Sequence, residues 1–452
     1  MMSLSLQSIA QYCDGQLVGQ DLSITQVCTD TRQGCEDALF IALQGARFDA
    51  HSFVQDAIAH GAVALVVKDR QQVEQPQVIV PDTQVALGRI AALWRQQLSI
   101  PLIAITGSNG KTTVKEMLAA ILKQKGPVLA TSGNFNNEIG VPLTLLNLRE
   151  THRYAVLEHG ASHTGDIAYL VQFSAPTVAL VTNAGAAHLE GFGSVEKVAQ
   201  AKGDIYAGLQ STGTAVINLD DHYSKLWLTM SAHARQLTFG FSAQADVRGE
   251  IEADGVFSIH WQNNKKRIAL SLIGRHNQQN ALAAATAALA VGATLEEIQA
   301  GLGSCQPVPG RLQTIPCGRL TVIDDTYNAN PDSFAVALKS AVAVGDNVWC
   351  LMGDMGEVGE ETENAHRKVG VLARQLGVRK LLALGSLSQR AAEAFGEGGH
   401  VFSQQEALVD WVWENAGPGA VLLVKGSRSA HMEFVVQALL EKTNNHVKDA
   451  AQ

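Results

Sequence analysis

A glycine-rich segment near residue 107 has the composition of a phosphate-binding loop. It follows an apolar run typical of a buried strand and reads Thr106-Gly107-Ser108-Asn109-Gly110-Lys111-Thr112-Thr113. Its glycines would let backbone N–H groups curl around phosphates, Lys111 would neutralise the β- and γ-phosphates, and Thr112 would bind Mg²⁺. The first glycine of the longer G-x-x-x-x-G-K-[ST] pattern is replaced by Ile105. An ordinary strand–turn–helix with a surface lysine is the alternative, but the flanking strand and helix favour a nucleotide site.

Two further side chains stand at or just beyond the ends of expected parallel strands, where open α/β sheets bind ligands. Glu158 ends the apolar run Tyr154–Glu158, and a carboxylate at that place can bind a metal ion. His188 lies in the loop after the next strand, where a neutral imidazole could reach a metal ion. Position alone leaves a solvated strand end for Glu158, and a structural role for His188, equally open.

Lys202 lies in an apolar stripe of the helix expected over residues 194–209. Val195, Val198 and Ile205 share one helix face with it. Burial would lower the pKa of the amine, and a neutral amine is a nucleophile that can add CO₂ to give a metal-binding carbamate. The alternative is a lysine that reaches the rim of the helix, which the spacing alone favours.

Placing these residues requires an α/β architecture, and the chain divides into three blocks. Residues 1–98 alternate short strands, such as 38–43 and 63–67, with helices, such as 53–59. Residues 99–310 carry helices at 112–123 and 278–291 and strands at Leu102–Thr106, Tyr154–Glu158, 177–182 and Thr214–Asn218. Residues 311–452 repeat the rhythm, with strands at 320–324, 348–352, Lys380–Leu384 and Val421–Lys425. We expect a small mixed α/β N-terminal domain, a central parallel-sheet domain and a C-terminal, doubly wound Rossmann-like domain.

The composition is that of a water-soluble protein. The chain has 452 residues, 34 basic and 43 acidic, with a net charge of −9 and no basic run suited to nucleic acid. The N-terminus lacks a signal peptide pattern and no long apolar run predicts a membrane helix, so we expect a cytoplasmic protein. The six cysteines are scattered without a C-x-x-C pair, so we expect free thiols.

Longer segments resemble motifs of a single enzyme family, the Mur ligases, along essentially the whole chain. Besides the phosphate loop they are Asp30-Thr31-Arg32, the run 39–45, the loop 133–142, Ala201-Lys202-Gly203-Asp204-Ile205-Tyr206, Gly274-Arg275-His276-Asn277, Pro309-Gly310-Arg311, the run 324–330 and Lys425-Gly426-Ser427-Arg428-Ser429. The third block lacks the DNPR-type motif of the diaminopimelate-adding member. The chain is therefore most similar to the member that adds D-alanyl-D-alanine.

The resemblance implies an ATP-dependent ligase that adds D-Ala-D-Ala to UDP-N-acetylmuramoyl-tripeptide in peptidoglycan synthesis, and through it supports cell shape and division. It implies that residues 1–98 bind the UDP end, residues 99–310 bind ATP, and residues 311–452 bind the dipeptide and close over the nucleotide. The implied cofactors are ATP, two Mg²⁺ ions and a CO₂-derived carbamate on Lys202. We expect a monomer that neither binds nucleic acid nor enters a membrane.

The resemblance also implies a role for each matching residue. The catalytic set is Lys111, Glu158, His188, Lys202 and Arg311. The nucleotide set is Gly107, Ser108, Asn109, Gly110, Lys111, Thr112, Thr113, Asn277, Arg311 and Asp325. The metal ligands are Thr112, Glu158, His188 and Lys202. The substrate set is Thr31, Arg32, Asn136, Asn137, Asn328, Asp354, Ser427 and Arg428, for which loop and helix capping is the alternative.

The chain departs from the family pattern at three positions. His159 stands where an apolar residue is usual, Ser162 where Asn is usual, and Thr326 where Ser is usual. None of them removes a group with an implied catalytic role. Two other functions stay open: a related ligase with another substrate, such as a folate polyglutamating enzyme, and a nucleotide-binding regulator without ligase chemistry.

Overall fold

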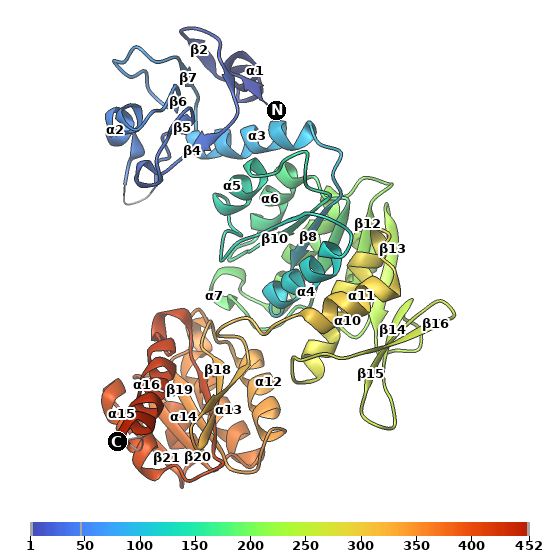
Figure 1. Cartoon of the computed structure of the whole chain (residues 1–452), viewed down its shortest axis with the longest axis vertical. Helices are drawn as coiled ribbons and strands as arrows, with labels where there is room; N and C mark the ends of the chain where they lie inside the picture. Colours follow the sequence, from blue (N-terminus) through green and yellow to red (C-terminus); the bar gives the residue numbers. More distant parts are fainter. Residues whose placement is uncertain (1–2, 46–47, 450–452) are drawn as a thin grey trace.

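Three domains follow one another along the chain (Figure 1). The computed structural model describes residues 3–45 and 48–449, so the first two and last three residues lie outside the description. Each domain is built on its own sheet of five, nine or six strands, and a separate two-stranded pair joins β1 (Leu4–Ser5) to β3 (Ser23–Ile24). Within the described ranges, no helix is long and apolar enough to cross a membrane.

The N-terminal domain carries the five-stranded sheet, in the order β2-β7-β6-β5-β4. Its strands are Gln16–Val18, Gln77–Ile79, Ala64–Val67, Leu39–Ile41 and Val27–Cys28. Helix α2 (Val54–Ala59) packs near the sheet. Helix α3 (Thr83–Gln96) follows its N-cap residue Asp82, whose carboxylate accepts from the backbone N–H groups of residues 84 and 85. The expected mixed α/β character is confirmed.

The expectation of six free thiols is wrong for two cysteines in this domain. Cys28 and Cys35 form a disulfide, while the other four described cysteines are free and buried. The short 3₁₀-helix Thr31–Gln33 folds the chain back between them and brings their Cα atoms to 5.5 Å, within disulfide range. A spacing of seven residues gave no sign of this turn.

The central domain has a nine-stranded sheet that is parallel over most of its width. The strand order is β16-β15-β14-β13-β12-β11-β8-β10-β9. The apolar strands β8 (Leu102–Thr106), β10 (Tyr154–Glu158) and β11 (Val178–Val181) are neighbours toward the β9 end of the sheet, and their side chains are buried because helices cover both faces there. Helices α4 (Lys111–Lys123), α10 (Arg275–Ala290) and α11 (Leu295–Ser304) cover one face. Helices α5 (Gly140–Leu146), α6 (Asp166–Ser174) and α8 (Val195–Gly203) cover the other.

An antiparallel extension of this sheet was not predicted. Strands β14 (Val247–Ile251), β15 (Phe257–Trp261) and β16 (Asn264–Ile268) form a ribbon at its edge. The edge strand is polar, and Lys265, Lys266 and Arg267 pair with acidic residues. Such a charged edge discourages pairing with another chain.

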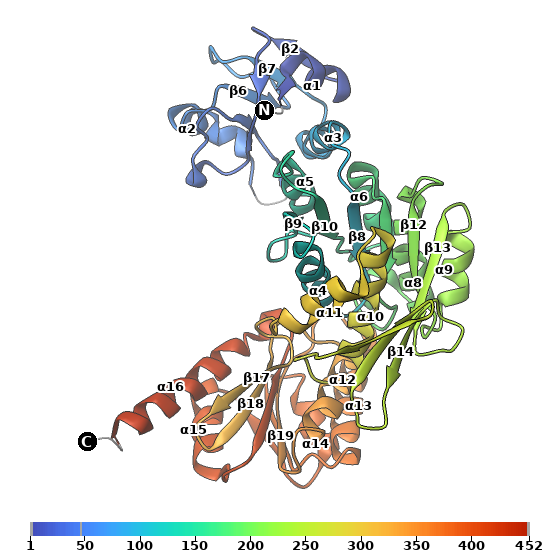
Figure 2. The ribbon, with the colours of Figure 1, turned by 45° about the vertical axis from the view of Figure 1, so that its right-hand side comes forward.

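The C-terminal domain is the doubly wound domain expected from the sequence. Its six strands run in the order β17-β18-β22-β19-β20-β21, and all neighbours are parallel except β17 (Gln313–Cys317) and β18 (Leu320–Asp325). Helices α12 (Pro331–Val342), α13 (Thr362–Gln375) and α14 (Gln389–Phe395) cover one face. Helices α15 (Gln405–Asn415) and α16 (Glu433–Asp449) cover the other, and α16 extends beyond the domain (Figure 2).

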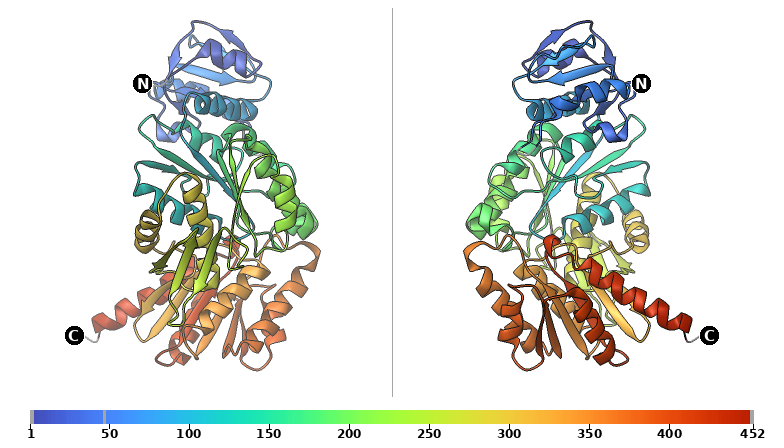
Figure 3. Two further views of the ribbon diagram at one scale, coloured as in Figure 1. Left: turned by 90° about the vertical axis from the view of Figure 1, so that its right-hand side faces the viewer. Right: turned by 90° about the vertical axis from the view of Figure 1, so that its left-hand side faces the viewer.

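The N-terminal and central domains share one continuous core. Helix α3 lies across the top of the central domain, against α5 and α6 (Figure 3). Leu87 and Ile90 of α3 join the cluster that contains Val141, Leu145 and Leu170. Trp94 donates from Nε1 to the Leu148 carbonyl at 2.9 Å. The cores of the C-terminal domain are separate clusters.

Candidate active site

A cavity of about 1060 Å³ lies between the central and C-terminal domains. The carboxyl ends of β8, β10 and β11 open into it from one side, and those of β18 and β22 (Val421–Lys425) from the other. This is the edge at which open α/β sheets bind ligands. The predicted site residues that line it are Ser108, Asn109, Gly110, Lys111, Thr112, Thr113, Asn136, Asn137, Glu158, His188, Asn277, Arg311, Asp325 and Asn328.

The phosphate loop joins β8 to α4 and is fixed by polar contacts within its own domain. Gly107 has φ +148°, and a Cβ there would lie 1.8 Å from Thr182 Oγ1, so a side chain has no room. Asn109 donates its backbone N–H to Asn183 Oδ1 at 3.0 Å. The first-turn N–H groups of α4 have no partner within the helix, and this end of a helix favours anions.

Lys111 is the first residue of α4 and carries the positive charge of the loop. Its Nζ donates to the Gly107 carbonyl at 2.8 Å. Burial lowers the pKa of the amine below its usual value, with the Arg311 guanidinium acting in the same direction and the Glu158 carboxylate opposing both. Two cations and one carboxylate therefore converge here, as a polyphosphate with a divalent cation would require.

Glu158 is buried and held from two sides. Its Oε2 accepts from Thr112 Oγ1 at 2.8 Å, and its Oε1 accepts from Asn136 Nδ2 at 2.9 Å. A hydroxyl and a carboxylate in contact at the end of a phosphate loop are oxygen ligands of the kind that Mg²⁺ prefers. The residues present therefore fit one Mg²⁺ ion at Thr112 and Glu158.

His188 meets the C-terminal domain across the cavity. It has a left-handed backbone, with φ +54°, and its Nδ1 lies 2.6 Å from Glu357 Oε2. The imidazole lowers the pKa of the Glu357 carboxyl below its usual value. No cluster of three His, Cys, Asp or Glu side chains placed to hold a metal ion occurs in the described part of the chain. The expected second Mg²⁺ site therefore lacks a complete set of unmodified ligands.

Lys202 is buried on α8 and does not reach the helix rim. Only 1% of the residue is exposed, and its Nζ lies 5.7 Å from the centre of the Phe192 ring. Burial lowers the pKa of this amine well below its usual value, and the Lys111 charge lowers it further, while Asp166 opposes the shift. The alternative of a lysine at the rim is excluded by this burial. Lys202 is not among the residues that line the cavity.

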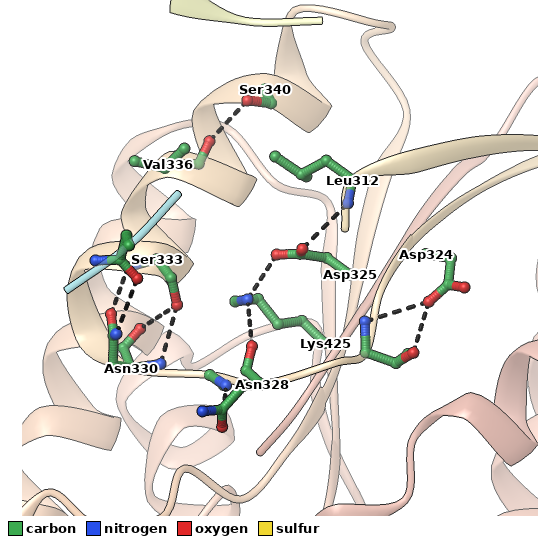
Figure 4. A network of polar contacts seen from close by, with 12 residues as sticks. Leu312, Asp324, Asp325, Asn328, Asn330, Ser333, Val336, Ser340 and Lys425 are labelled. Carbon is green, nitrogen blue, oxygen red and sulfur yellow. Dashed lines mark hydrogen bonds and ion pairs between the residues drawn. The ribbon is translucent and has the colours of Figure 1, made fainter. Parts of the chain in front are cut away.

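The nucleotide end predicted around Asn277 and Asp325 faces the same cavity from α10 and β18. Asp325 accepts from the Leu312 backbone at 3.1 Å and from Lys425 Nζ at 2.6 Å (Figure 4). The Arg311 guanidinium lies 4.1 Å from the centre of the Tyr327 ring. The segment between the two domains thus carries a cation that faces the phosphate loop.

Three family models match the chain. They are the Mur ligase middle domain over residues 105–288, the Mur ligase glutamate ligase domain over residues 310–428, and the Mur ligase family catalytic domain over residues 23–125. A UDP-N-acetylmuramoyl-tripeptide–D-alanyl-D-alanine ligase of Escherichia coli strain K12 is 42% identical over 449 residues, which are 98% of this chain and 99% of that protein. The chain belongs to the Mur ligase family.

Solved Mur ligase structures agree with this fold over its whole length. A MurF structure from Acinetobacter baumannii has a TM-score of 0.91 and 34% identity, covering 98% of this chain and 99% of that chain. A MurF ligase from Thermotoga maritima, solved with ADP, has a TM-score of 0.83 and 26% identity, covering 93% and 98%. The three-domain architecture expected from the sequence is the architecture of the Mur ligase fold.

Five predicted substrate residues of this Mur ligase lie outside the cavity lining. Thr31 and Arg32 belong to the N-terminal domain, where exposed Arg32 pairs with Asp30 at 2.7 Å. The others, in the C-terminal domain, are Asp354, Ser427 and Arg428. Asp354 accepts the backbone N–H of Ser388 at 2.7 Å, and Arg428 pairs with Glu433 at 3.1 Å. The contact of Asp354 agrees with the loop and helix capping kept open as the alternative.

Contacts between the Mur ligase domains were missed by sequence reasoning. Asn330 Nδ2 donates to Asn109 Oδ1 at 3.0 Å, and Asp332 Oδ2 accepts from the Ala186 backbone at 2.8 Å. Asn330 also caps α12, with Pro331 at the first helical position. That capping pattern is visible in the sequence, but it does not reveal that the helix start touches a loop more than two hundred residues away.

The three departures from the family pattern fall near the cavity. His159 is fully buried, neither ring nitrogen has a hydrogen-bond partner among the described residues, and burial lowers the pKa of the imidazole to about 3. Ser162 lines the cavity and donates its backbone N–H to Asp166 at 2.8 Å. Thr326 donates to Asp324 Oδ1 at 2.6 Å.

Proposed function

We propose that the chain is a cytoplasmic, ATP-dependent ligase that joins D-Ala-D-Ala to UDP-N-acetylmuramoyl-tripeptide, releasing ADP and phosphate. One observation carries the proposal: a single cavity gathers Lys111 and Glu158 from the central domain and Arg311 and Asp325 from the C-terminal side. The printed names of full-length relatives supply the substrates. The product would serve peptidoglycan synthesis and, through it, cell shape and division.

The chemistry begins with a carboxylate, which is a poor electrophile. In the proposed first step the tripeptide carboxylate attacks the γ-phosphate of ATP and forms an acyl phosphate and ADP. Lys111 and Arg311 would stabilise the charge on the transferred phosphoryl group, and Thr112 with Glu158 would hold Mg²⁺. Bound Mg²⁺ supplies charge neutralisation of the phosphates.

The second step forms the amide bond. The amine of D-Ala-D-Ala attacks the acyl carbon and forms the N–C bond of a tetrahedral intermediate. On collapse the bond from the acyl carbon to the phosphate oxygen breaks, inorganic phosphate leaves with the electron pair, and the nitrogen loses a proton. Water would hydrolyse the acyl phosphate, so the two domains must exclude it. The contacts of Asn330 with Asn109 and of Asp332 with Ala186 support a closed arrangement at this place.

We also propose that Lys202 carries a carbamate that, with Glu158 and His188, binds a second Mg²⁺ ion. A neutral amine adds CO₂ and releases a proton, and the burial that lowers the pKa of Lys202 favours the neutral amine that this addition needs. Lys202→Ala should abolish turnover, and added bicarbonate should not restore it. A carbamate signal in the ¹³C NMR spectrum of wild type in ¹³C-bicarbonate, absent in the variant, is a readout independent of activity. Wild-type turnover in Lys202→Ala would remove the idea.

The three domains have separate proposed roles. Residues 1–98 bind the UDP end with Thr31 and Arg32, residues 99–310 bind ATP, and residues 311–452 bind the dipeptide and close over the nucleotide. Asn136 and Asn137 would contact the peptide, and both line the cavity. Asn277 would contact the adenine and Asp325 the ribose, while Asn328, Asp354, Ser427 and Arg428 remain proposed for the dipeptide side.

The decisive experiment measures ADP release with UDP-linked tripeptide, with and without D-Ala-D-Ala. Release should require both, and single amino acids, including glutamate and diaminopimelate, should not replace the dipeptide. Release with a single amino acid and none with D-Ala-D-Ala would identify a different ligase. Nucleotide binding without ADP release under any acceptor would favour the regulator.

A further inference from the structure

Lys425 is a buried cation that the proposed mechanism does not use. It ends β22, between β18 and β19 (Val348–Gly353) in the middle of the C-terminal sheet, and 1% of it is exposed. The residues before it on the strand are apolar and buried. Its Nζ donates to Asp325 Oδ2 at 2.6 Å and to the Asn328 carbonyl at 2.8 Å (Figure 4).

Stability alone does not explain a lysine at this position. Removing two charges from water costs about as much as their attraction returns, and an apolar pair of similar size is often equally stable. Asp325 and Lys425 are aligned partners on adjacent parallel strands, so their side chains leave the sheet on the same side. Both line the cavity. The pair is better explained by the position that it gives to the Asp325 carboxylate.

Asp325 joins this pair to the segment that connects the two domains. Its Oδ1 accepts from the Leu312 backbone at 3.1 Å, and Leu312 has φ +51°, a conformation that residues with a Cβ rarely adopt. The same segment is bonded to the turn after β18, since Tyr327 donates its backbone N–H to the Gly310 carbonyl at 3.0 Å.

Arg311 lies between these two anchors. Its guanidinium stands over the Tyr327 ring at 4.1 Å, and its charge acts on Lys111 in the phosphate loop. The direction of the Arg311 side chain therefore depends on a backbone that Asp325 holds from one side. Asp325, in turn, has Lys425 as its only side-chain partner among the described residues.

We propose that Lys425 is a positioning residue for the nucleotide: it fixes the Asp325 carboxylate, and through the Leu312 N–H it fixes the backbone that aims Arg311. This deepens the proposed function, because it assigns to one residue the alignment of both the ribose contact and the phosphate contact of the C-terminal side. In this proposal the effect of Lys425 on the nucleotide passes through Asp325, while its second bond, to the Asn328 carbonyl, holds the turn after β18.

A double-mutant cycle tests this dependence. The full-length variants are Lys425→Met, Asp325→Asn and the double variant, with KM for ATP, kcat and the Kd of ADP by titration calorimetry. Each single change should weaken ADP binding and raise the KM for ATP by roughly tenfold. The double variant should bind ADP as tightly as the single variant with the lower ADP affinity. The KM for D-Ala-D-Ala should stay within about twofold in every variant.

Lys380→Met is the matched control. Lys380 is also a sheet lysine of this domain, lying 5.4 Å from the centre of the Trp349 ring, and it is absent from the cavity lining. It should leave ADP binding unchanged. Two outcomes would overturn the proposal: a lower melting temperature of Lys425→Met with wild-type ADP affinity, or single effects that multiply in the double variant. ADP affinity is measured without turnover, so the result stands apart from the ligase assay, whose failure would instead contradict the proposed reaction.

Discussion

The phosphate loop and the Arg311–Asp325 segment line the same cavity, but they are held in different ways. Most bonds of the loop are to residues of its own domain, such as Asn109 to Asn183 and Thr112 to Glu158, and one bond, from Asn330 to Asn109, comes from the C-terminal domain. The other segment depends on Lys425, a hundred residues away, and it reaches the loop only while the two domains stand together. The phosphate loop therefore forms a preformed wall of the site, which the central domain builds by itself. The Arg311–Asp325 segment forms the other wall, which is complete only when the C-terminal domain is placed against the central domain. Substitutions in the preformed wall should mainly lower kcat, whereas substitutions at the boundary between the walls should mainly raise the KM for ATP.

The largest effect is expected at the centre of the preformed wall. Lys111→Met should lower kcat by about a thousandfold, because a cation facing the transferred phosphoryl group is lost from a dry site. The melting temperature should not fall, because burial of the charged Lys111 amine costs free energy and lowers its pKa, and methionine carries no such cost. Phosphate release measures the rate. Lys123→Met, at the exposed other end of α4, is the control, and an equal loss in both would refute a local role.

Glu158→Gln should lower kcat by about a hundredfold and raise the Mg²⁺ concentration needed for half-maximal rate. The amide keeps the size of the side chain and can still contact Thr112 and Asn136, but it loses the charge that would hold the cation. A magnesium titration of the rate checks this. Glu150→Gln, on the exposed approach to β10, should change neither quantity. An unchanged magnesium requirement in Glu158→Gln would place the cation elsewhere.

At the boundary between the walls, Asp332→Ala should raise the KM for ATP several-fold and leave kcat nearly unchanged. The variant loses the bond from the Ala186 backbone, so the closed arrangement becomes less populated and apparent affinity falls with it. Glu363→Ala is the matched control, since Glu363 is also an acidic residue in the first turn of a helix of the same domain. If kcat fell instead of affinity, Asp332 would act in the chemical step.

The smallest effect concerns the acid stability of the C-terminal domain. His366 is buried and neutral, with Nε2 accepting from the Met355 backbone at 2.9 Å, and burial lowers its pKa below 6.5. Below about pH 6.5 the imidazole is therefore protonated in the unfolded chain but stays neutral in the folded chain. The free energy of unfolding should fall in this range by up to ~1.4 kcal/mol per pH unit. Melting temperatures between pH 7 and 5 check this. His366→Gln should make the slope smaller without removing it, because buried His159 also has a lowered pKa, and the same change at exposed His233 should leave the slope unchanged.

Local patterns predicted the preformed wall well. The phosphate loop and strands β8 and β10 are encoded within short segments by glycine placement and continuous apolar runs. For Lys202 the spacing alone favoured a lysine at the helix rim, and the structure shows it buried instead. The other wall could be predicted only in part. Lys425 ends an apolar run, but nothing near it in the sequence indicates that Asp325 is its partner.

The remaining misses have similar causes. The disulfide between Cys28 and Cys35 depends on a short turn. In the ribbon, β14 and β15 alternate apolar and polar residues and β16 is polar, so none of these strands has a continuous apolar run. Contacts such as Asn330 with Asn109 arise from the relative placement of two domains, which no local pattern records. Chemistry-bearing residues were thus easier to find than the residues that hold them.

The core shared by α3 and the central domain has a consequence for dissecting the protein. A fragment that starts at Pro101 would expose the apolar surfaces of α5 and α6 that Leu87 and Ile90 cover, and it should aggregate. A fragment that stops at Ser304 keeps both clusters of the central sheet almost intact and should remain monodisperse. The N-terminal and central domains should therefore unfold as one cooperative unit, separately from the C-terminal domain, whose cores are separate clusters.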